Sequence, residues 1–368
     1  MSNKKIMITG GHLTPALAVM SVLGETWQVI YVGRKHALEG DVAISQEYRI
    51  MHERNIPFRN ITAGRIQRKF TTRTLWSLLK IPVGFLQGLY FVWRDKPDVV
   101  LSFGGYVALP VVVAARIFGV PVVTHEQTIT PGLASRIIAT FAQKVCIGFP
   151  GENKMPQGEK YVITGNPLRN ELTKTSKPLN ITTAKPLLFI TGGNLGSHSI
   201  NMIIEKMLPD LLKHYTVLHQ TGNAVEFRDF ERLSHLKQKL PSDLAKRYNL
   251  FAYIDAQFMS WVFTHTHIII GRSGANTVTE LIFFQIPSLL IPLPWSGSGE
   301  QSSQAQYLSS HNAAVCIEQK NANSEAIKSA LAKIEASYRQ IQKNLRKLAD
   351  TLPQNPAIKI RDVIESVA

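Results

Sequence analysis

Short apolar runs alternate with helix-length segments along the whole of this 368-residue chain. In the first half the runs occupy residues 6–9, 28–32, 98–102, 121–124, 144–147 and 161–163. In the second half they occupy residues 187–191, 216–219, 250–253, 267–270, 288–291 and 314–317. Runs of this length and spacing are typical of strands in parallel sheets that helices cover on both faces. The pattern therefore predicts an α/β protein.

A strand, a glycine turn and a helix open each half of the chain. Thr9-Gly10-Gly11 in the first half corresponds to Thr191-Gly192-Gly193 in the second. After the first turn, Thr14 suits the N-cap of a helix and Pro15 suits its first position. The recurrence, in a chain too long for one typical domain, predicts two Rossmann-like halves.

The join between the halves is expected near Gly165-Asn166-Pro167, before a polar, weakly patterned segment. We therefore expect one domain over residues 1–165 and a second over 166–351, with a last helix at about 352–368 packed back on the first. Folds of this kind bind ligands at the carboxyl ends of their strands. A cleft between two facing sheets is the expected site.

The segment 268–280 indicates a nucleotide site. An apolar run ends at Gly271, a polar turn follows, and a helix is expected to begin near Thr277. Free backbone N–H groups and the positive end of a helix suit a diphosphate. Glu280, about one turn into the helix, is placed to accept hydrogen bonds from both ribose hydroxyls. The motif is neither a dinucleotide fingerprint nor a Walker loop, and an ordinary strand–turn–helix with a solvated glutamate is the alternative.

Composition narrows the class of protein. Hydrophobic residues make up 45% of the chain, yet no apolar run is long enough for a transmembrane helix. The N-terminus lacks the apolar core of a signal peptide, and the two cysteines, Cys146 and Cys316, are far apart. We expect a cytoplasmic protein with no disulfide, no metal site and no cofactor.

The net charge of +15 points to an anionic partner. Basic residues gather in the segment 49–80, followed by an aromatic, apolar run that Lys80 and Pro82 interrupt. This order predicts a segment that lies on an anionic membrane surface. Its members would be Arg68, Lys69, Arg73, Trp76 and Phe85. A core helix with a solvated basic loop is the alternative, and no nucleic-acid partner is expected because no binding motif accompanies the charge.

An ordered set of motifs resembles the MurG glycosyltransferases over almost the whole chain. The set comprises Thr9-Gly10-Gly11-His12, Phe103-Gly104-Gly105-Tyr106, His125-Glu126-Gln127, Thr164-Gly165-Asn166-Pro167-Leu168-Arg169, Gly192-Gly193, Arg272-Ser273-Gly274-Ala275 with Glu280, and Gln301. The resemblance implies the GT-B fold. It also implies transfer of N-acetylglucosamine from its UDP donor to the 4-hydroxyl of an undecaprenyl-diphosphate-linked muramyl-pentapeptide, with inversion, in peptidoglycan synthesis at the cytoplasmic face of the membrane.

The same resemblance implies roles for individual residues. On the donor side it assigns Arg169, Asn194, Ile254, Arg272, Ser273, Gly274, Ala275, Glu280, Glu300 and Gln301. On the acceptor side it assigns Gly10, Gly11, Tyr106, His125 and Thr128, with His12 and Glu126 as catalytic residues. The chain departs from the family at Asn194, where a serine is usual, at Thr128, where an asparagine is usual, and in a shorter first glycine loop.

The chemistry needs a base for the acceptor hydroxyl and charge stabilisation for the leaving diphosphate. A histidine on a glycine loop, His12, can be the base, with His125 or Glu126 as alternatives. Helix N-termini can stabilise the leaving group without a metal, and the chain has no Asp-x-Asp pair. Three other functions stay open: a UDP-sugar 2-epimerase, a related transferase with another lipid acceptor such as a diacylglycerol, and a non-catalytic membrane scaffold.

Overall fold

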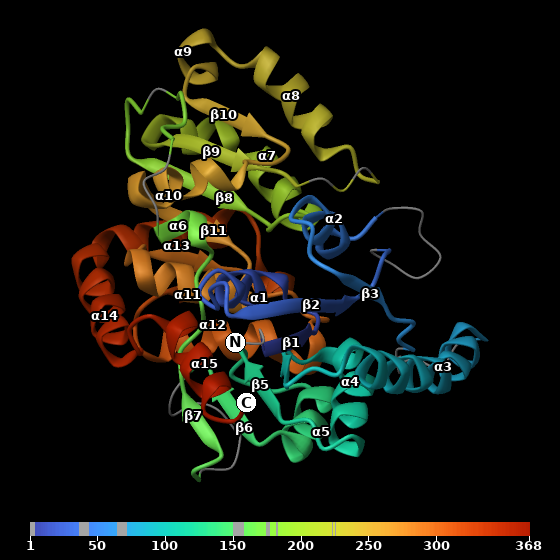
Figure 1. Ribbon diagram of the computed structural model, residues 1–368. Coiled ribbons are helices and arrows are strands. Elements are labelled where there is room, and N and C mark those ends of the chain that lie inside the picture. The colour runs from blue at the N-terminus through green and yellow to red at the C-terminus, as the bar shows by residue number, and fades with distance from the viewer. Residues whose placement is uncertain are drawn as a thin grey trace. The chain divides into compact units, whose positions relative to one another are not determined.

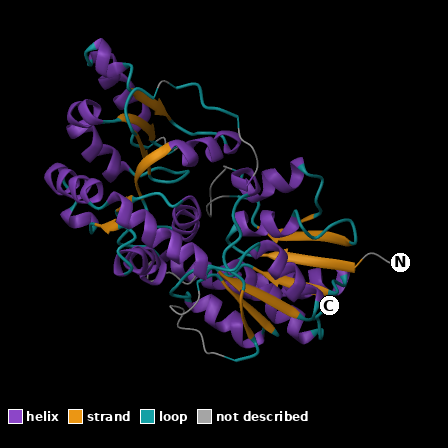
Figure 2. Cartoon of the chain, turned by 90° about the vertical axis from the view of Figure 1, so that its left-hand side faces the viewer, coloured by secondary structure: helices purple, strands orange, loops and turns teal. Residues whose placement is uncertain are grey.

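The computed structural model describes residues 4–36, 44–64, 72–149, 158–173, 177–181, 183–222, 224 and 226–368. The chain forms two compact units, one of residues 1–169 with 352–368 and the other of residues 170–351. Each unit holds one parallel sheet with helices on both sides, which confirms the α/β class (Figures 1 and 2).

The sheet of the first unit has the order β3-β2-β1-β4-β5-β6-β7, and every pair is parallel. Its strands are β1 Lys4–Thr9, β2 Trp27–Gly33, β3 Phe58–Asn60, β4 Val99–Ser102, β5 Val122–Glu126, β6 Lys144–Ile147 and β7 Tyr161–Ile163. Strand order reverses between β1 and β4. Ligands of open α/β sheets bind beyond the carboxyl ends of the strands at such a reversal, which here is where the first glycine loop lies.

Helices cover both faces of this sheet. They are α1 Leu13–Met20, α2 Gln46–Glu53, α3 Thr72–Asp95, α4 Gly105–Ile117, α5 Leu133–Phe141 and α15 Pro356–Glu365. One core cluster packs α3, α4 and α5 against the sheet, and the other packs α1 and α15. Ile360 and Ile364 of α15 are fully buried in the same cluster as Ile6 and Ile8 of β1. The C-terminal helix therefore belongs to the first unit.

The sheet of the second unit has the order β10-β9-β8-β11-β12-β13. Its strands are β8 Leu187–Thr191, β9 Thr216–Gln220, β10 Tyr248–Phe251, β11 Thr266–Gly271, β12 Ser288–Leu290 and β13 Val315–Cys316. Its helices are α6 Asn170–Thr173, α7 His198–His214, α8 Asp229–Lys239, α9 Ser242–Ala245, α10 Ala256–His265, α11 Ala275–Phe284, α12 Glu300–Ser310, α13 Ser324–Ala336 and α14 Tyr338–Thr351, with 3₁₀ turns η1 Gly297–Gly299 and η2 Gln319–Asn321. Strand order reverses between β8 and β11, and both carry glycine loops at their carboxyl ends.

Three sequence-based expectations about the starts of helices need correction. The first helix begins at Leu13 with the extended residue His12 as N-cap, so the assignment of Thr14 as N-cap was wrong. Pro15 is then the third residue of the helix rather than the first, and it still lies in the first turn, where its missing N–H breaks no helical hydrogen bond. Helix α11 begins at Ala275 rather than near Thr277, because Gly274 already has the extended backbone of an N-cap.

Strand β10 lies two residues earlier than expected, because Tyr248 pairs with Val217 of β9 and is fully buried. The edge strand β3 was missed, since its three residues carry only one hydrophobic side chain. Among the residues described, no helix is long and apolar enough to cross a bilayer.

Candidate functional site

The first glycine loop brings the chain close to the end of strand β4. Gly10 has φ +138, and a Cβ there would lie 2.9 Å from the backbone of Phe103. Gly11 N–H donates to Gly104 O at 3.3 Å, and Phe103 N–H donates to Thr9 O at 2.8 Å. Only glycine at position 10 permits both the positive φ and the close approach.

This approach orients the side chain of His12. Its Nδ1 lies 2.8 Å from Phe103 O, and the ring is half-buried. A carbonyl oxygen only accepts hydrogen bonds, so Nδ1 carries the proton in the neutral ring and Nε2 keeps its lone pair. The loop therefore presents Nε2 as a proton acceptor in a defined orientation.

The end of strand β5 holds the other predicted acceptor-side residues. Glu126 is 5% exposed, and its Oε1 accepts hydrogen bonds from Thr128 N at 2.8 Å and from Thr128 Oγ1 at 2.6 Å. Thr128, in place of the usual asparagine, thus holds the Glu126 carboxylate through two donors. Tyr106, near the start of α4, lies beneath the Arg34 guanidinium, 5.5 Å from the ring centroid.

His125 is 2% exposed and its Nε2 lies 3.1 Å from Gly165 O, so this nitrogen carries the proton. Burial lowers the pKa of His125 to about 4, although the hydrogen bond to Gly165 O acts in the opposite direction. The ring is therefore neutral near pH 7. Its Nδ1 has no hydrogen-bond partner among the residues described.

The second glycine loop, after β8, requires its glycines for steric reasons. A Cβ on Gly192 would lie 2.3 Å from Ser197 N, and one on Gly196 would lie 1.8 Å from Thr221 O. Ser197 is the N-cap of α7, so the loop ends at the positive end of a long helix. Asn194, in the usual serine position, is exposed on this loop.

Gln220, at the end of β9, is a residue that the sequence analysis did not single out. Its Nε2 donates to Thr191 Oγ1 at 3.3 Å and to Gly193 O at 3.2 Å. Its Oε1 accepts from the backbone N–H of Ile254 at 3.1 Å. Gln220 thus joins the glycine loop to Ile254 and occupies the N–H of that residue.

The turn after β11 carries the predicted diphosphate residues. Arg272 Nη1 donates to Ile291 O at 2.8 Å, and Nη2 donates to Ser197 Oγ at 2.7 Å. Ser273 is fully buried and its Oγ donates to Gln301 O at 2.8 Å. Gly274 and Ala275 then form the N-cap and first residue of α11. The turn is therefore bound directly to the N-terminus of α7 and to α12.

Glu280 and Gln301 lie on the two helices that follow this edge of the sheet. Glu280 is 4% exposed on α11, which excludes the interpretation of a solvated glutamate. Gln301 is half-buried, and its Oε1 accepts from Leu293 N at 3.0 Å. Glu300 is the first residue of α12.

The predicted residues divide between the two units. The first unit brings together the residues Gly10, Gly11, His12, Tyr106, His125, Glu126 and Thr128 at the end of its sheet. The second unit holds the predicted donor residues, which follow the carboxyl ends of β8, β10, β11 and β12: Asn194, Ile254, Arg272, Ser273, Gly274, Ala275, Glu280, Glu300 and Gln301. Arg169, predicted for the donor side, is the last residue of the first unit before the chain enters the second.

The predicted membrane segment is described only in part. Arg68 and Lys69 lie outside the described residues, and for Arg73 and Trp76 only the helical backbone of α3 is described. Phe85 is half-buried. Among the side chains of α3 that the structure describes, from residue 80 on, four others that are apolar are exposed, at spacings of three and four residues: Val83, Leu86, Tyr90 and Trp93. These four side chains, the outer stripe of α3, share one face of the helix.

The opposite face of α3 packs tightly against the unit. A Cβ on Gly84 would lie 2.4 Å from Thr62 O, and one on Gly88 would lie 2.8 Å from Pro110 O. The two glycines therefore fix which side of α3 faces the core, and the outer stripe is left toward solvent.

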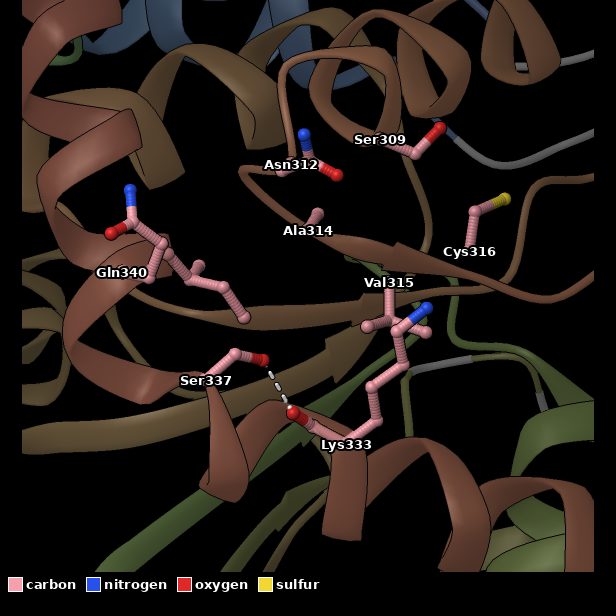
Figure 3. Close-up of a pocket in the computed structure, with 9 residues that line it drawn as sticks. Ser309, Asn312, Ala314, Val315, Cys316, Lys333, Ser337 and Gln340 are labelled. Atoms are coloured by element: carbon pink, nitrogen blue, oxygen red, sulfur yellow. Dashed lines mark hydrogen bonds between the residues drawn. The ribbon is translucent and has the colours of Figure 1, made fainter.

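Over the described ranges, neither a metal cluster nor the cavity in Figure 3 coincides with the predicted donor residues. Among the described residues, no cluster of three or more His, Cys, Asp or Glu side chains is placed to hold a metal ion. A cavity of about 470 Å³ in the second unit is lined by residues of α12, β13, α13 and α14 and of the loop before β13, among them Asn312, Cys316 and Lys333 (Figure 3). None of the predicted donor residues lines it.

Comparison with known proteins places the chain in a family. The model of the glycosyltransferase family 28 N-terminal domain matches residues 9–147, and that of the C-terminal domain matches residues 187–356. A protein of Clostridium novyi named UDP-N-acetylglucosamine--N-acetylmuramyl-(pentapeptide) pyrophosphoryl-undecaprenol N-acetylglucosamine transferase is 32% identical over 377 residues, which cover 99% of each chain.

Solved structures agree in fold. MurG from Acinetobacter baumannii is 26% identical, with a TM-score of 0.73 and 99% of each chain covered. A UDP-GlcNAc 2-epimerase from Neisseria meningitidis is 12% identical, with a TM-score of 0.60 and 99% of each chain covered, which shows a shared fold alone. The resemblance and the GT-B fold inferred from the sequence are confirmed, and the chain belongs to glycosyltransferase family 28.

Proposed function

We propose that this chain transfers N-acetylglucosamine from UDP-GlcNAc to the 4-hydroxyl of undecaprenyl-diphosphate-linked N-acetylmuramyl-pentapeptide, with inversion at the anomeric carbon. This is the conversion of lipid I to lipid II in peptidoglycan synthesis. The observation that carries the proposal is the 32% identity with the Clostridium novyi transferase over 99% of each chain. Both glycine loops, the buried Glu280 and the oriented His12 supply the parts that such a reaction needs.

In this proposal the second unit binds the donor. The N-termini of α7 and α11 and the Arg272 side chain take the diphosphate, and Glu280 takes the ribose hydroxyls. The backbone of Ile254 reads the uracil through its carbonyl, because Gln220 already accepts from its N–H. Arg169 completes the donor side, while Glu300 and Gln301 bind hydroxyls of the sugar. Asn194 contacts the diphosphate through its amide in place of a serine hydroxyl.

The first unit binds the acceptor and supplies the base. His12 Nε2 removes the proton of the 4-hydroxyl, since Nδ1 is held by Phe103 O. His125 is a weaker candidate because burial lowers its pKa to about 4. The Glu126 carboxylate is a weaker candidate because it accepts two hydrogen bonds from Thr128. Both residues instead hold the acceptor edge of the sheet in place, with Tyr106 beside them.

Groups already in place stabilise the negative charge that develops on the leaving UDP. Backbone N–H groups at two helix N-termini and the Arg272 cation face the bond that breaks, so the reaction proceeds without a bound metal ion. In this proposal the carboxylates of the donor site, Glu280 and Glu300, bind hydroxyls of the ribose and the sugar, and the groups assigned to the diphosphate are backbone N–H groups, an amide and a guanidinium.

We also propose that the first unit rests on the cytoplasmic face of the cell membrane as a peripheral protein. The outer stripe of α3 inserts among the lipids, and Arg68, Lys69 and Arg73 contact anionic headgroups. A lipid-linked acceptor can then reach the first glycine loop while its chain stays in the bilayer.

Replacing Leu86 and Trp93 by Asp is expected to release the protein from anionic vesicles while UDP binding and the melting temperature are retained. Both side chains are more than half exposed, so the change removes inserted surface without disturbing the core. Co-sedimentation with vesicles containing phosphatidylglycerol measures the effect. Reversal of Arg68, Lys69 and Arg73 to Glu should act in the same direction, and binding of the wild type should fall as salt rises.

Phe230→Asp in the second unit is the matched control, because it exchanges another partly exposed aromatic residue for a charge. Its vesicle binding should equal that of the wild type. Wild-type co-sedimentation of the α3 variants would show instead that this helix is ordinary surface.

A transferase with another lipid acceptor is the second candidate, because the chain departs from the family pattern in the acceptor unit. In the test, purified protein is incubated with labelled UDP-GlcNAc and one of two acceptors, either polyprenyl-diphosphate muramyl-pentapeptide or diacylglycerol. We expect label in the first lipid alone. Transfer to diacylglycerol would favour the second candidate.

A further inference from the structure

The Arg272 guanidinium in the second unit is held by neutral oxygen atoms. Its Nη1 donates to Ile291 O. Its Nη2 lies 2.7 Å from Ser197 Oγ, 2.7 Å from Gln319 Oε1 and 3.1 Å from Ser199 Oγ. Ser199 Oγ also donates to Gln319 Oε1 at 3.2 Å. Gln319 therefore accepts from both residues through one amide oxygen, and it reaches them from η2, the turn that follows the edge strand β13.

No carboxylate balances this cation within the part of the chain that the structure describes. Burial lowers the pKa of Arg272 to about 10, and no neighbouring acid raises it, so the guanidinium stays protonated near pH 7. An acid is available one residue away, but Glu318 pairs with Lys320 at 2.8 Å. The chain thus places a neutral amide against Arg272 and directs the adjacent carboxylate elsewhere.

The surroundings of Arg272 add positive potential. Ser197 is the N-cap of α7, and Arg272 itself lies three residues before the start of α11. Two helix N-termini and a partly buried cation therefore meet at one place, which favours an anionic ligand. A guanidinium has five N–H donors, and the contacts described occupy at most three of them. Donors are left for such a ligand.

We propose that Gln319 is a positioning residue for the donor diphosphate: its neutral amide orients the Arg272 guanidinium without neutralising it. This inference rests on the proposed UDP site. A glutamate has nearly the same shape, but at position 319 it would pair with Arg272 and repel the diphosphate. The choice of amide over carboxylate at this position is therefore a determinant of donor affinity.

The decisive variant is Gln319→Glu, assayed with UDP and with uridine. We expect UDP affinity to fall about tenfold or more, the equivalent of losing one charge-assisted hydrogen bond, while uridine affinity stays unchanged. The melting temperature should not fall, since a new ion pair replaces a hydrogen bond. Gln340→Glu is the matched control, because it makes the same exchange at an exposed position of α14 and should bind UDP as the wild type does.

Two more variants separate positioning from folding. Gln319→Leu removes the acceptor without adding charge, so its loss of UDP affinity should be smaller than that of Gln319→Glu. In an Arg272→Met background, Gln319→Glu should weaken UDP binding much less than in the wild type, because the guanidinium through which it acts is gone.

Equal UDP affinity of Gln319→Glu and the wild type would overturn the proposal, as would a parallel loss of uridine binding, which indicates local misfolding. If Glu280→Ala and Arg272→Met also left UDP binding intact, the proposed donor site itself would be wrong. If those two variants lost UDP binding while Gln319→Glu kept it, only the role of Gln319 would fall.

Discussion

Substituting alanine for His12 is expected to lower kcat by about 10²–10⁴ while UDP affinity changes little. The structure explains both halves of this expectation. The Phe103 carbonyl holds Nδ1–H, so Nε2 is the only basic atom that the loop offers, and alanine offers none. The residue belongs to the first unit, whereas the UDP-binding residues proposed here belong to the second.

Steady-state kinetics with the lipid acceptor, together with calorimetric titration of UDP, measures the two quantities. His52→Ala in α2 is a suitable control, since it removes a histidine of the same unit that has no proposed role. Near wild-type turnover of the His12 variant would mean that His125 or Glu126 is the base. Because burial lowers the pKa of His125 to about 4, a rate controlled by that group should titrate well below neutral pH.

Glu280→Ala is expected to weaken UDP binding by about 10- to 100-fold, since a carboxylate that accepts from two ribose hydroxyls contributes more than one charge-assisted hydrogen bond. Glu280 is 4% exposed on α11, so its orientation is set by the helix and its surroundings rather than by solvent. Titration calorimetry of the variant with UDP measures the loss.

Glu280→Gln keeps the shape of the side chain and should lose less affinity than Glu280→Ala. A melting temperature close to that of the wild type is needed for either result to count as a binding effect. UDP affinity unchanged in both variants would remove Glu280 from the donor site.

Most of the fold could be predicted from the sequence, because buried parallel strands leave a strong local pattern. Strands β6, β7 and β8 have the predicted boundaries, since apolar runs there end in polar or glycine residues. The pattern failed where local signals were weak. Strand β3 has one hydrophobic residue, and the boundary of α1 depends on the turn at Gly10 rather than on the residues that usually cap helices.

The glycine loops and Glu280 could be located from sequence, because strand–glycine–helix order is local. The supporting contacts could not, since they join residues distant in the chain. Gln319 lies 120 residues from Ser199, and Phe103 lies 91 residues from His12. Neither pairing leaves a periodic signal. The exposed face of α3 could not be predicted either, because the packing of Gly84 and Gly88 decides which apolar side chains turn outward.

Analysis of the reaction product tests the central claim most directly. Purified protein is incubated with isotopically labelled UDP-GlcNAc and the lipid-linked muramyl-pentapeptide, in the presence of EDTA, and the products are examined by NMR. We predict label in the lipid fraction, joined through a β-linkage to the 4-hydroxyl of the muramyl sugar. Label that stays in the aqueous phase as a 2-epimerised sugar, or transfer that needs added metal, would contradict the account.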